Sequence, residues 1–289
     1  MILSKTDVII QNIIDCSADA QRYSAEIDLL LDDLIFDVEL THKSMSDIKS
    51  DVCNKYTLLQ NARLKSYTFV SEYEISREQQ YICKKIATHL NRKLGFGVEL
   101  VRKLNSVKIA YWYSNSYAKD AYLKFKKLFK VCSEIPVESI NAVCESVDDE
   151  NFVFGIIPVI NSTDGRLMSF YRLLDKYDLK ISAICKIENH GGGGFTKYAL
   201  VSKQPIDVDM KKKKTIEFST NKSISKFVSF IDNIDSAFGE ITSIPSPYSD
   251  TEQINYISIS GEQNLIYELW LYLYLFVGDA DFIGLYTEI

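Results

Sequence analysis

The chain has 289 residues, of which 46% are hydrophobic, 12% aromatic and 25% charged. These fractions are typical of globular proteins, so disordered, collagen-like and coiled-coil classes are excluded. The length fits two domains or three small ones. The formal net charge of −6 favours solubility and argues against a protein that binds polyanions over its whole surface.

We find no targeting signal, membrane-spanning segment or metal-binding motif in the sequence. The most apolar stretch, Leu265–Val277, is interrupted by Glu268 and falls short of the roughly 18–20 apolar residues of a membrane helix. The N-terminal apolar run lies between Asp7 and Asp15, unlike a signal peptide. Six scattered cysteines without Cys-x-x-Cys spacing predict reduced thiols in the cytoplasm. The three histidines lie far from any cysteine pair, so we expect no metal, and no motif calls for a cofactor.

Charge is distributed unevenly along the chain. Residues 1–40 hold nine acidic and two basic residues, whereas Lys84–Lys130 holds twelve basic and two acidic ones. The basic segment is either a solvated helical face or a surface for anionic ligands. No recognised nucleic-acid-binding motif accompanies it, so we expect no nucleic-acid partner.

The first hundred residues have a helical pattern. Apolar side chains recur three or four residues apart between Met45 and Leu59. Ser76–Gln79 has the pattern of a capping box, which predicts a second helix, and the glycines at 95 and 97 precede a short helix expected over Val98–Leu104. Residues 1–105 are therefore predicted to form an α-helical domain.

The pattern changes at Val107, where strands and helices begin to alternate. We expect strands over 107–113, 129–132, 152–158 and 180–187, with helices over 116–129, 137–147 and 166–176 between them. This alternation predicts an α/β lobe, whose ligand site should lie at the carboxyl ends of the strands, around Trp112–Tyr117 and Pro158–Gly165.

Four consecutive glycines follow His190. A phosphate-binding loop needs a following helix, but here the run leads into a predicted strand, Phe195–Ser202, so we interpret it as a connector. Beyond Pro205–Lys214 the expected order is strand (215–219), helix (223–234), strand (240–244), strand (254–260), helix (265–276) and strand (281–287). This is the order of a ferredoxin-like unit.

The α/β segment resembles prephenate dehydratase, and the ferredoxin-like tail resembles an ACT domain, which senses amino acids. The motifs are Tyr113-Ser-Asn-Ser-Tyr117, Pro158-Val-Ile-Asn-Ser162, Tyr177-Asp-Leu-Lys-Ile181 and Thr196-Lys-Tyr198. The resemblance covers roughly 107–289. It implies catalytic roles for Thr196, Asn161 and Ser162, with Thr196 as proton donor to a leaving hydroxyl, and substrate-binding roles for Ser116, Tyr117 and Lys197.

The helical segment is similar to the chorismate mutase that precedes the dehydratase in bifunctional enzymes. Lys65 and the Glu74-Ile-Ser-Arg77-Glu78 segment match that family's spacing, with Lys55 earlier on the same stretch. The resemblance implies catalytic roles for Lys65, Arg77 and Glu78 and substrate-binding roles for Lys55 and Glu74. Cations suit a dicarboxylate that rearranges in a preorganised site, although an ordinary charged helix surface explains the same residues equally well.

The predicted fold class is thus an all-helical domain (1–105), a single truncated α/β lobe like half of a periplasmic binding protein (106–206), and a ferredoxin-like ACT domain (213–289). Only Glu188–Phe195 stands where the dehydratase family inserts its second lobe. Lys197 replaces the family's Arg, losing its bidentate fork, and Ile160 replaces a Glu. A cleft with one wall cannot exclude water, so we expect no dehydratase turnover.

Two hypotheses about function follow. In the first, the chain is an enzyme of phenylalanine biosynthesis that acts on chorismate or prephenate, with the mutase activity retained. In the second, it is a degenerate relative with a regulatory or oligomerising role, or an enzyme repurposed for another chorismate-derived acid. The resemblance also implies a homodimer and an amino-acid effector, whose binding residues the sequence does not identify.

Overall fold

The computed structural model describes residues 25, 29, 45–65, 72–90, 99–100, 106–149, 153–204, 206–207, 213–221, 238–245, 253–277 and 280–289. The chain divides into two compact units. One comprises Met1–His89 with Leu271–Gly278, and the other Leu90–Trp270 with Asp279–Ile289. In the described part, no helix is long and apolar enough to cross a membrane.

The first unit contains two long helices, α2 (Met45–Lys65) and α3 (Glu72–Leu90). Their apolar residues at helical spacing, among them Ile48, Val52 and Ile86, are buried. The α2 side chains meet the single π-helical turn η4 (Leu273–Val277): the Tyr56 ring lies 5.3 Å from that of Phe276. The unit is thus helical in its described part, whereas its identity as a chorismate mutase stays a prediction.

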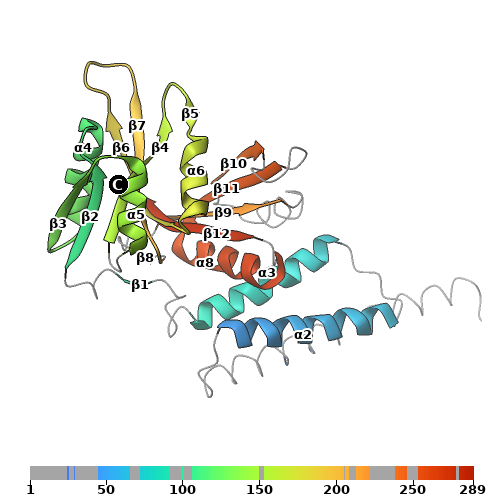
Figure 1. Ribbon diagram of the computed structural model, residues 1–289. Coiled ribbons are helices and arrows are strands. Elements are labelled where there is room, and N and C mark those ends of the chain that lie inside the picture. Colours follow the sequence, from blue (N-terminus) through green and yellow to red (C-terminus); the bar gives the residue numbers. More distant parts are fainter. Residues whose placement is uncertain are drawn as a thin grey trace, which may run out of the picture. The chain divides into compact units, whose positions relative to one another are not determined.

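The second unit is built on one ten-stranded sheet. Its path runs β10-β11-β9-β12-β6-β7-β4-β2-β3, and β5 is paired to β4 (Figure 1). The strand bounds are β2 Val107–Trp112, β3 Cys132–Val137, β4 Val153–Asn161, β5 Gly165–Arg166, β6 Lys180–Glu188, β7 Phe195–Ser202, β9 Lys213–Thr220, β10 Phe238–Pro245, β11 Gln253–Glu262 and β12 Asp281–Glu288. Two-residue strands β1 (Glu99–Leu100) and β8 (Ile206–Asp207) pair separately.

Helices cover both faces of the α/β lobe. α4 (Ser116–Phe125), continued by the 3-10 turn η3 (Lys126–Leu128), packs on one face, where Phe125, Phe154 and Tyr198 are buried together. α5 (Ile140–Asp149) and α6 (Met168–Lys176) contribute Val143 and Phe170 to the core on the other face. The sheet is mixed: β4 runs parallel to β2 but antiparallel to β7.

The C-terminal strands have the arrangement of a ferredoxin-like unit. Strands β10, β11, β9 and β12 lie in that order, and each is antiparallel to its neighbours within this group of four. Helix α8 (Gln263–Tyr272) connects β11 to β12. The helix predicted over 223–234 lies outside the described residues. Strand β12 also pairs in parallel with β6, so that one sheet joins the lobe to these strands. That these strands are an ACT domain stays a prediction.

Three sequence-based expectations need correction. The helix expected over 166–176 begins at Met168, because Arg166 pairs with Ile160 in strand β5. The helix expected over Val98–Leu104 is wrong at Glu99–Leu100, which form strand β1 because their backbone pairs in parallel with Ile206–Asp207. The strand expected at Phe129–Cys132 lies later, at Cys132–Val137, because the preceding residues continue α4 as a 3-10 turn. The five described cysteines form no disulfide, and burial raises the pKa of Cys144 and of Cys185 to about 12, so both thiols stay protonated.

Candidate functional site

One edge of the lobe gathers most of the residues predicted for the dehydratase-like site. Strands β2, β4 and β6 end at this edge and β7 begins there, because β2 and β4 are parallel while β7 is antiparallel to both β4 and β6. In the register of the sheet, Thr196 lies opposite Asn161 on one side and Ile187 on the other. Asn161 and Ser162 therefore lie at the carboxyl end of β4, and that a ligand binds at this edge stays a prediction.

Thr196 lies on the face of β7 that α4 covers. Alternate side chains of a strand share a face, and Tyr198, two residues on, is buried against α4. The hydroxyl of Tyr198 donates to Asn115 Oδ1 over 3.4 Å, and burial raises its pKa to about 12. Within the described part of the chain, the Thr196 hydroxyl makes no hydrogen bond, so a ligand could use it as donor and acceptor.

Asn161 and Ser162 have polar groups that already hold the local backbone. Asn161 Oδ1 accepts from the Thr163 amide at 2.9 Å, and its Nδ2 donates to Asp164 at 3.2 Å. Ser162 Oγ accepts from the Phe195 amide at 3.0 Å, and the Ser162 amide donates to the Phe195 carbonyl at 2.9 Å. Both residues thus fix the β4–β5 turn against the start of β7, which leaves mainly the Ser162 hydroxyl proton for a ligand.

The start of α4 forms the neighbouring wall of this edge. Asn115 caps the helix, since its Oδ1 accepts from the amides of Tyr117 and Ala118 at 3.0 and 3.2 Å. Ser116 is exposed, and the half-buried Tyr117 ring stacks on His190 with centroids 5.1 Å apart.

Asp120 and His190 belong to this edge and were missed as site residues in the sequence. His190 Nε2 lies 2.9 Å from Asp120 Oδ2, which brings together groups 70 residues apart. Neither residue belongs to a motif with a recognisable spacing. Asp120 lies about one turn into a helix, and His190 is a lone histidine before a run of glycines. The pair holds the β6–β7 connection against α4.

The four glycines form the tip of a β-hairpin between β6 and β7. The Asn189 amide donates to the Gly194 carbonyl at 2.9 Å, and Gly191–Gly193 have positive φ angles. A Cβ on Gly194 would lie 2.6 Å from Ser162 Oγ, so only glycine lets the hairpin come this close to the turn. The segment is a connector between strands, as the sequence indicated, and here it is an ordered hairpin.

Lys197 points away from Thr196, as alternation along β7 requires. Its Nζ lies 2.7 Å from Glu288 Oε1 at the end of β12. This ion pair is partly exposed, since 24% of the Lys197 side chain is accessible. The substrate-binding role expected of Lys197 stays a prediction.

The mutase-like residues lie in the other compact unit. Lys55 and Lys65 are on α2, whereas Glu74, Arg77 and Glu78 are on α3. Lys55 and Glu78 are half-buried and Arg77 is exposed; the side chains of Lys65 and Glu74 lie outside what the structure describes. Their roles stay predictions. The described residues contain no group of three or more His, Cys, Asp or Glu side chains that could hold a metal ion.

Comparisons with known proteins bear on the lobe. Residues 113–189 match the family model of prephenate dehydratase. The middle of this chain is prephenate dehydratase-like. The match begins just before α4 and ends at Asn189, seven residues before Thr196. A search of curated protein sequences found no match.

Solved structures show the same likeness. Prephenate dehydratase from Streptococcus mutans aligns at 18% identity with a TM-score of 0.50, covering 63% of this chain and all of the other. The quorum-quenching acylase GqqA aligns at 14% identity with a TM-score of 0.46, covering 62% of this chain and 94% of the other. Prephenate dehydratase from Arthrobacter aurescens, solved with L-Phe, aligns at 12% identity with a TM-score of 0.45, covering 63% of this chain and 90% of the other. Identities this low show a shared fold only. The predicted resemblance to prephenate dehydratase is confirmed at this level, as a lobe of that family's type.

Proposed function

We propose that this chain is a prephenate dehydratase-type protein of phenylalanine biosynthesis that binds a small anionic ring acid, prephenate or chorismate, at the α4 edge of its sheet. The observation that carries the proposal is the Thr196 hydroxyl. It makes no hydrogen bond in the described part of the chain, although its neighbours Asn161, Ser162 and Tyr198 are all engaged. A polar group so placed among bonded ones is suited to an external ligand.

The charge of the surrounding surface supports an anionic ligand. Exposed lysines 119, 124, 126 and 127 lie along α4 and η3, and the first turn of α4 lies at the edge that holds Thr196. Of the two interpretations of the basic segment, a solvated helical face describes most of these lysines. Their combined positive potential would still raise the local concentration of a carboxylate ligand.

The proposal includes binding and excludes dehydratase turnover. Dehydration of prephenate releases water and carbon dioxide to give phenylpyruvate, and the Thr196 hydroxyl would protonate the departing hydroxyl. That step requires an enclosed site that orients the ring and excludes bulk water. By the family resemblance, the hairpin at Asn189–Gly194 takes the place of a second lobe, and among the residues that the structure describes we expect a wall on one side of the edge only. We therefore expect the ligand to bind without conversion.

The mutase-like residues define a separate part of the proposal. Lys55, Lys65, Glu74, Arg77 and Glu78 would bind chorismate on α2 and α3, in a homodimer. An assay of chorismate consumption tests this part: we expect turnover that Arg77→Ala abolishes. A wild-type chain as inactive as Arg77→Ala would contradict it.

Thr196→Val is the direct test of the sheet-edge site. Valine keeps the shape of threonine and removes the hydroxyl, so we expect prephenate affinity, measured by calorimetry, to fall about five- to tenfold. Thr287→Val is the matched control, because it makes the same change on β12, where the hydroxyl is buried and has no partner in the described part. Equal prephenate affinity in wild type and Thr196→Val would sink the proposal, and phenylpyruvate formation would overturn the exclusion of turnover.

A second candidate is a non-catalytic regulatory or oligomerising relative. It is favoured by the continuous sheet, which joins the lobe to the ferredoxin-like strands through β12 and β6. An ACT-like unit of this kind would bind an amino-acid effector. Failure of both acids to bind, together with a rise in melting temperature on addition of phenylalanine, would favour this candidate over the first.

A further inference from the structure

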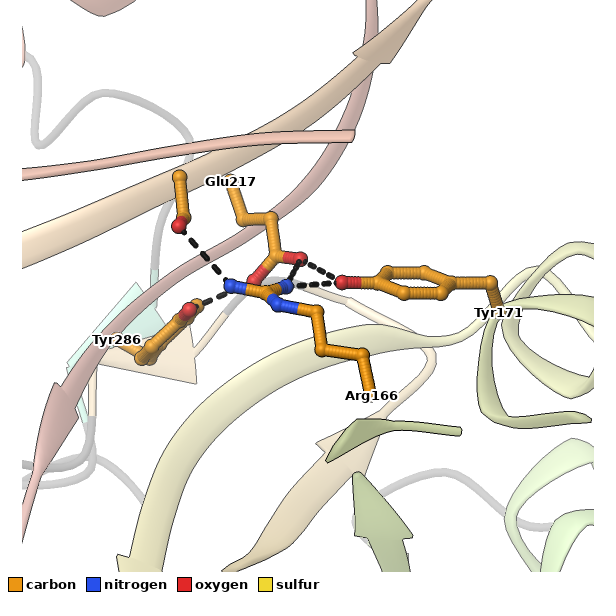
Figure 2. A network of polar contacts seen from close by, with 5 residues as sticks. Arg166, Tyr171, Glu217 and Tyr286 are labelled. Carbon is orange, nitrogen blue, oxygen red and sulfur yellow. Dashed lines mark hydrogen bonds and ion pairs between the residues drawn. The ribbon is translucent and has the colours of Figure 1, made fainter. Parts of the chain in front are cut away.

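A buried carboxylate lies at the centre of a polar cluster in the second unit (Figure 2). Glu217 is 1% exposed. Its Oε1 accepts from the Tyr171 hydroxyl at 2.5 Å and from Arg166 Nη1 at 3.0 Å, while its Oε2 accepts from the Tyr286 hydroxyl at 2.6 Å. Arg166 also contacts the Tyr171 hydroxyl and donates through Nη2 to Ser258 at 3.2 Å. We call these five residues the Glu217 cluster.

Both oxygens of the Glu217 carboxylate accept hydrogen bonds, so the geometry around this carboxylate is demanding. Burial and the Glu217 carboxylate raise the pKa values of Tyr171 and Tyr286, so both phenols remain protonated donors. A buried ion pair adds little net stability, but breaking it strands a charge away from water. Charge-assisted hydrogen bonds also fix distance and direction more tightly than apolar packing does. The cluster is suited to holding its members in one arrangement.

The members of the cluster come from both halves of the sheet. Arg166 lies on β5 and Tyr171 on α6, both in the α/β lobe. Glu217, Ser258 and Tyr286 lie on β9, β11 and β12, which are neighbours among the ferredoxin-like strands. All five belong to the same compact unit. The cluster therefore ties the lobe to these strands through side chains, beside the backbone pairing of β12 with β6.

Arg166 is also one residue from the turn that carries the candidate site. Strand β5 has two residues, and pairs Arg166 with Ile160 and Gly165 with Asn161. The chain between the strands is the turn that holds Ser162, and Gly165 at its end has a φ of 73°. A two-residue strand has few backbone hydrogen bonds to hold it. The guanidinium of Arg166, held by Glu217 and Ser258, anchors β5 in addition to the hydrogen bonds between Ser162 and Phe195.

We propose that the Glu217 cluster positions the Asn161–Ser162 turn, so that the ferredoxin-like strands set the geometry of the sheet-edge site. Arg166 is then a positioning residue: it touches no ligand and acts through β5 on the turn. Only the effect on ligand affinity rests on the proposed function; the ordering of the turn does not.

Amide hydrogen exchange in the full-length chain tests the positioning without any ligand. Tyr286→Phe removes one hydrogen bond to Glu217 from β12, a strand that β6 and β7 separate from β4 in the sheet. We expect exchange at the Ser162, Phe195 and Leu167 amides to accelerate about three- to tenfold, the value of one hydrogen bond. Exchange at Ala199 and Leu200, in the core of β7, should change less, because the loss is local.

Tyr177→Phe is the matched control, since it removes a hydroxyl at the end of α6 that donates to Glu145 and lies outside the cluster. The turn amides of Tyr286→Phe should exchange faster than those of Tyr177→Phe and should accelerate more than the amides in the core of β7. If they do not, the cluster only adds stability. Should Tyr286→Phe fail to fold, Ser258→Ala, which removes the hydrogen bond from Arg166 Nη2 to Ser258, is measured in the same way.

Prephenate binding adds a second readout. A double-mutant cycle between Tyr286→Phe and Ser162→Ala should give non-additive losses of prephenate affinity, because Tyr286 affects binding through the position of Ser162. Additive losses would contradict the positioning role. Accelerated turn exchange in a chain that binds no prephenate would leave the positioning intact and refute the proposed function alone.

Discussion

Two threonines on neighbouring strands show how the surroundings of one hydroxyl decide its effect on stability. Thr287 Oγ1 on β12 is buried without a hydrogen-bond partner in the described part, whereas Thr215 Oγ1 on β9 lies 2.7 Å from Ser260 Oγ. A buried hydroxyl that lacks a partner has lost its hydrogen bonds to water without replacement. The same substitution should therefore have opposite effects at the two positions.

We expect Thr287→Val to raise the free energy of unfolding by about 1 kcal/mol, and Thr215→Val to lower it by a similar amount. Denaturant unfolding of both variants beside the wild type measures the difference. A loss of stability in Thr287→Val would mean that its hydroxyl has a partner after all.

Single residues also show where sequence reasoning reached its limit at the site. Thr196, Asn161 and Ser162 could be grouped through the motifs that resemble prephenate dehydratase, and the structure pairs Asn161 with Thr196. His190 and Asp120 could not, since they meet through the hairpin tip rather than through any shared period. Glu217 looked like one polar residue in an alternating strand, and its partners lie 46, 51 and 69 residues away.

At the scale of elements, long apolar strands were predictable and two-residue strands were not. Strands β4, β6 and β7 are runs of β-branched and apolar residues, which the buried centre of a sheet requires. Strands β1, β5 and β8 have too few residues to show a period, and only their partners define them. The helix wrongly expected over Val98–Leu104 illustrates how tertiary pairing overrides local propensity.

The contact between β12 and β6 depends on a glycine. A Cβ on Gly284 would lie 2.7 Å from both Cβ and the carbonyl oxygen of Ile181, atoms of a buried strand that cannot easily move. We expect Gly284→Ala to lower the free energy of unfolding by about 2 kcal/mol through overpacking. Gly261→Ala is the control, because the nearest atom to its Cβ would be the flexible end of the Leu265 side chain at 3.0 Å, with Ile266 at an ordinary contact distance of 3.6 Å. Equal losses in the two variants, measured by urea unfolding, would count against a tight strand contact.

At the scale of the molecule, the shared sheet predicts that the lobe and the ferredoxin-like strands unfold together. The chain has two tryptophans: Trp112 on β2 in the lobe, and Trp270 on α8. The variant Trp270→Phe keeps Trp112 as a fluorescent reporter of the lobe, and Trp112→Phe keeps Trp270 as a reporter of the ferredoxin-like part. We expect Gly284→Ala to shift the fluorescence midpoint in urea equally in both backgrounds, because the two halves form one cooperative unit. A shift reported by only one of the two tryptophans would show that the lobe and the ferredoxin-like strands unfold separately.

The position of β12 between β9 and β6 has a consequence for synthesis of the chain. About a hundred residues separate Gly284 from its parallel partner Ile181. Until β12 emerges, the lobe ends at β6 and the ferredoxin-like strands end at β9, and each edge displays unpaired backbone groups. Open edges of this kind pair readily with foreign strands. The nascent chain therefore passes through an interval of aggregation risk that the arrival of one eight-residue strand ends, and chaperone dependence should be concentrated there.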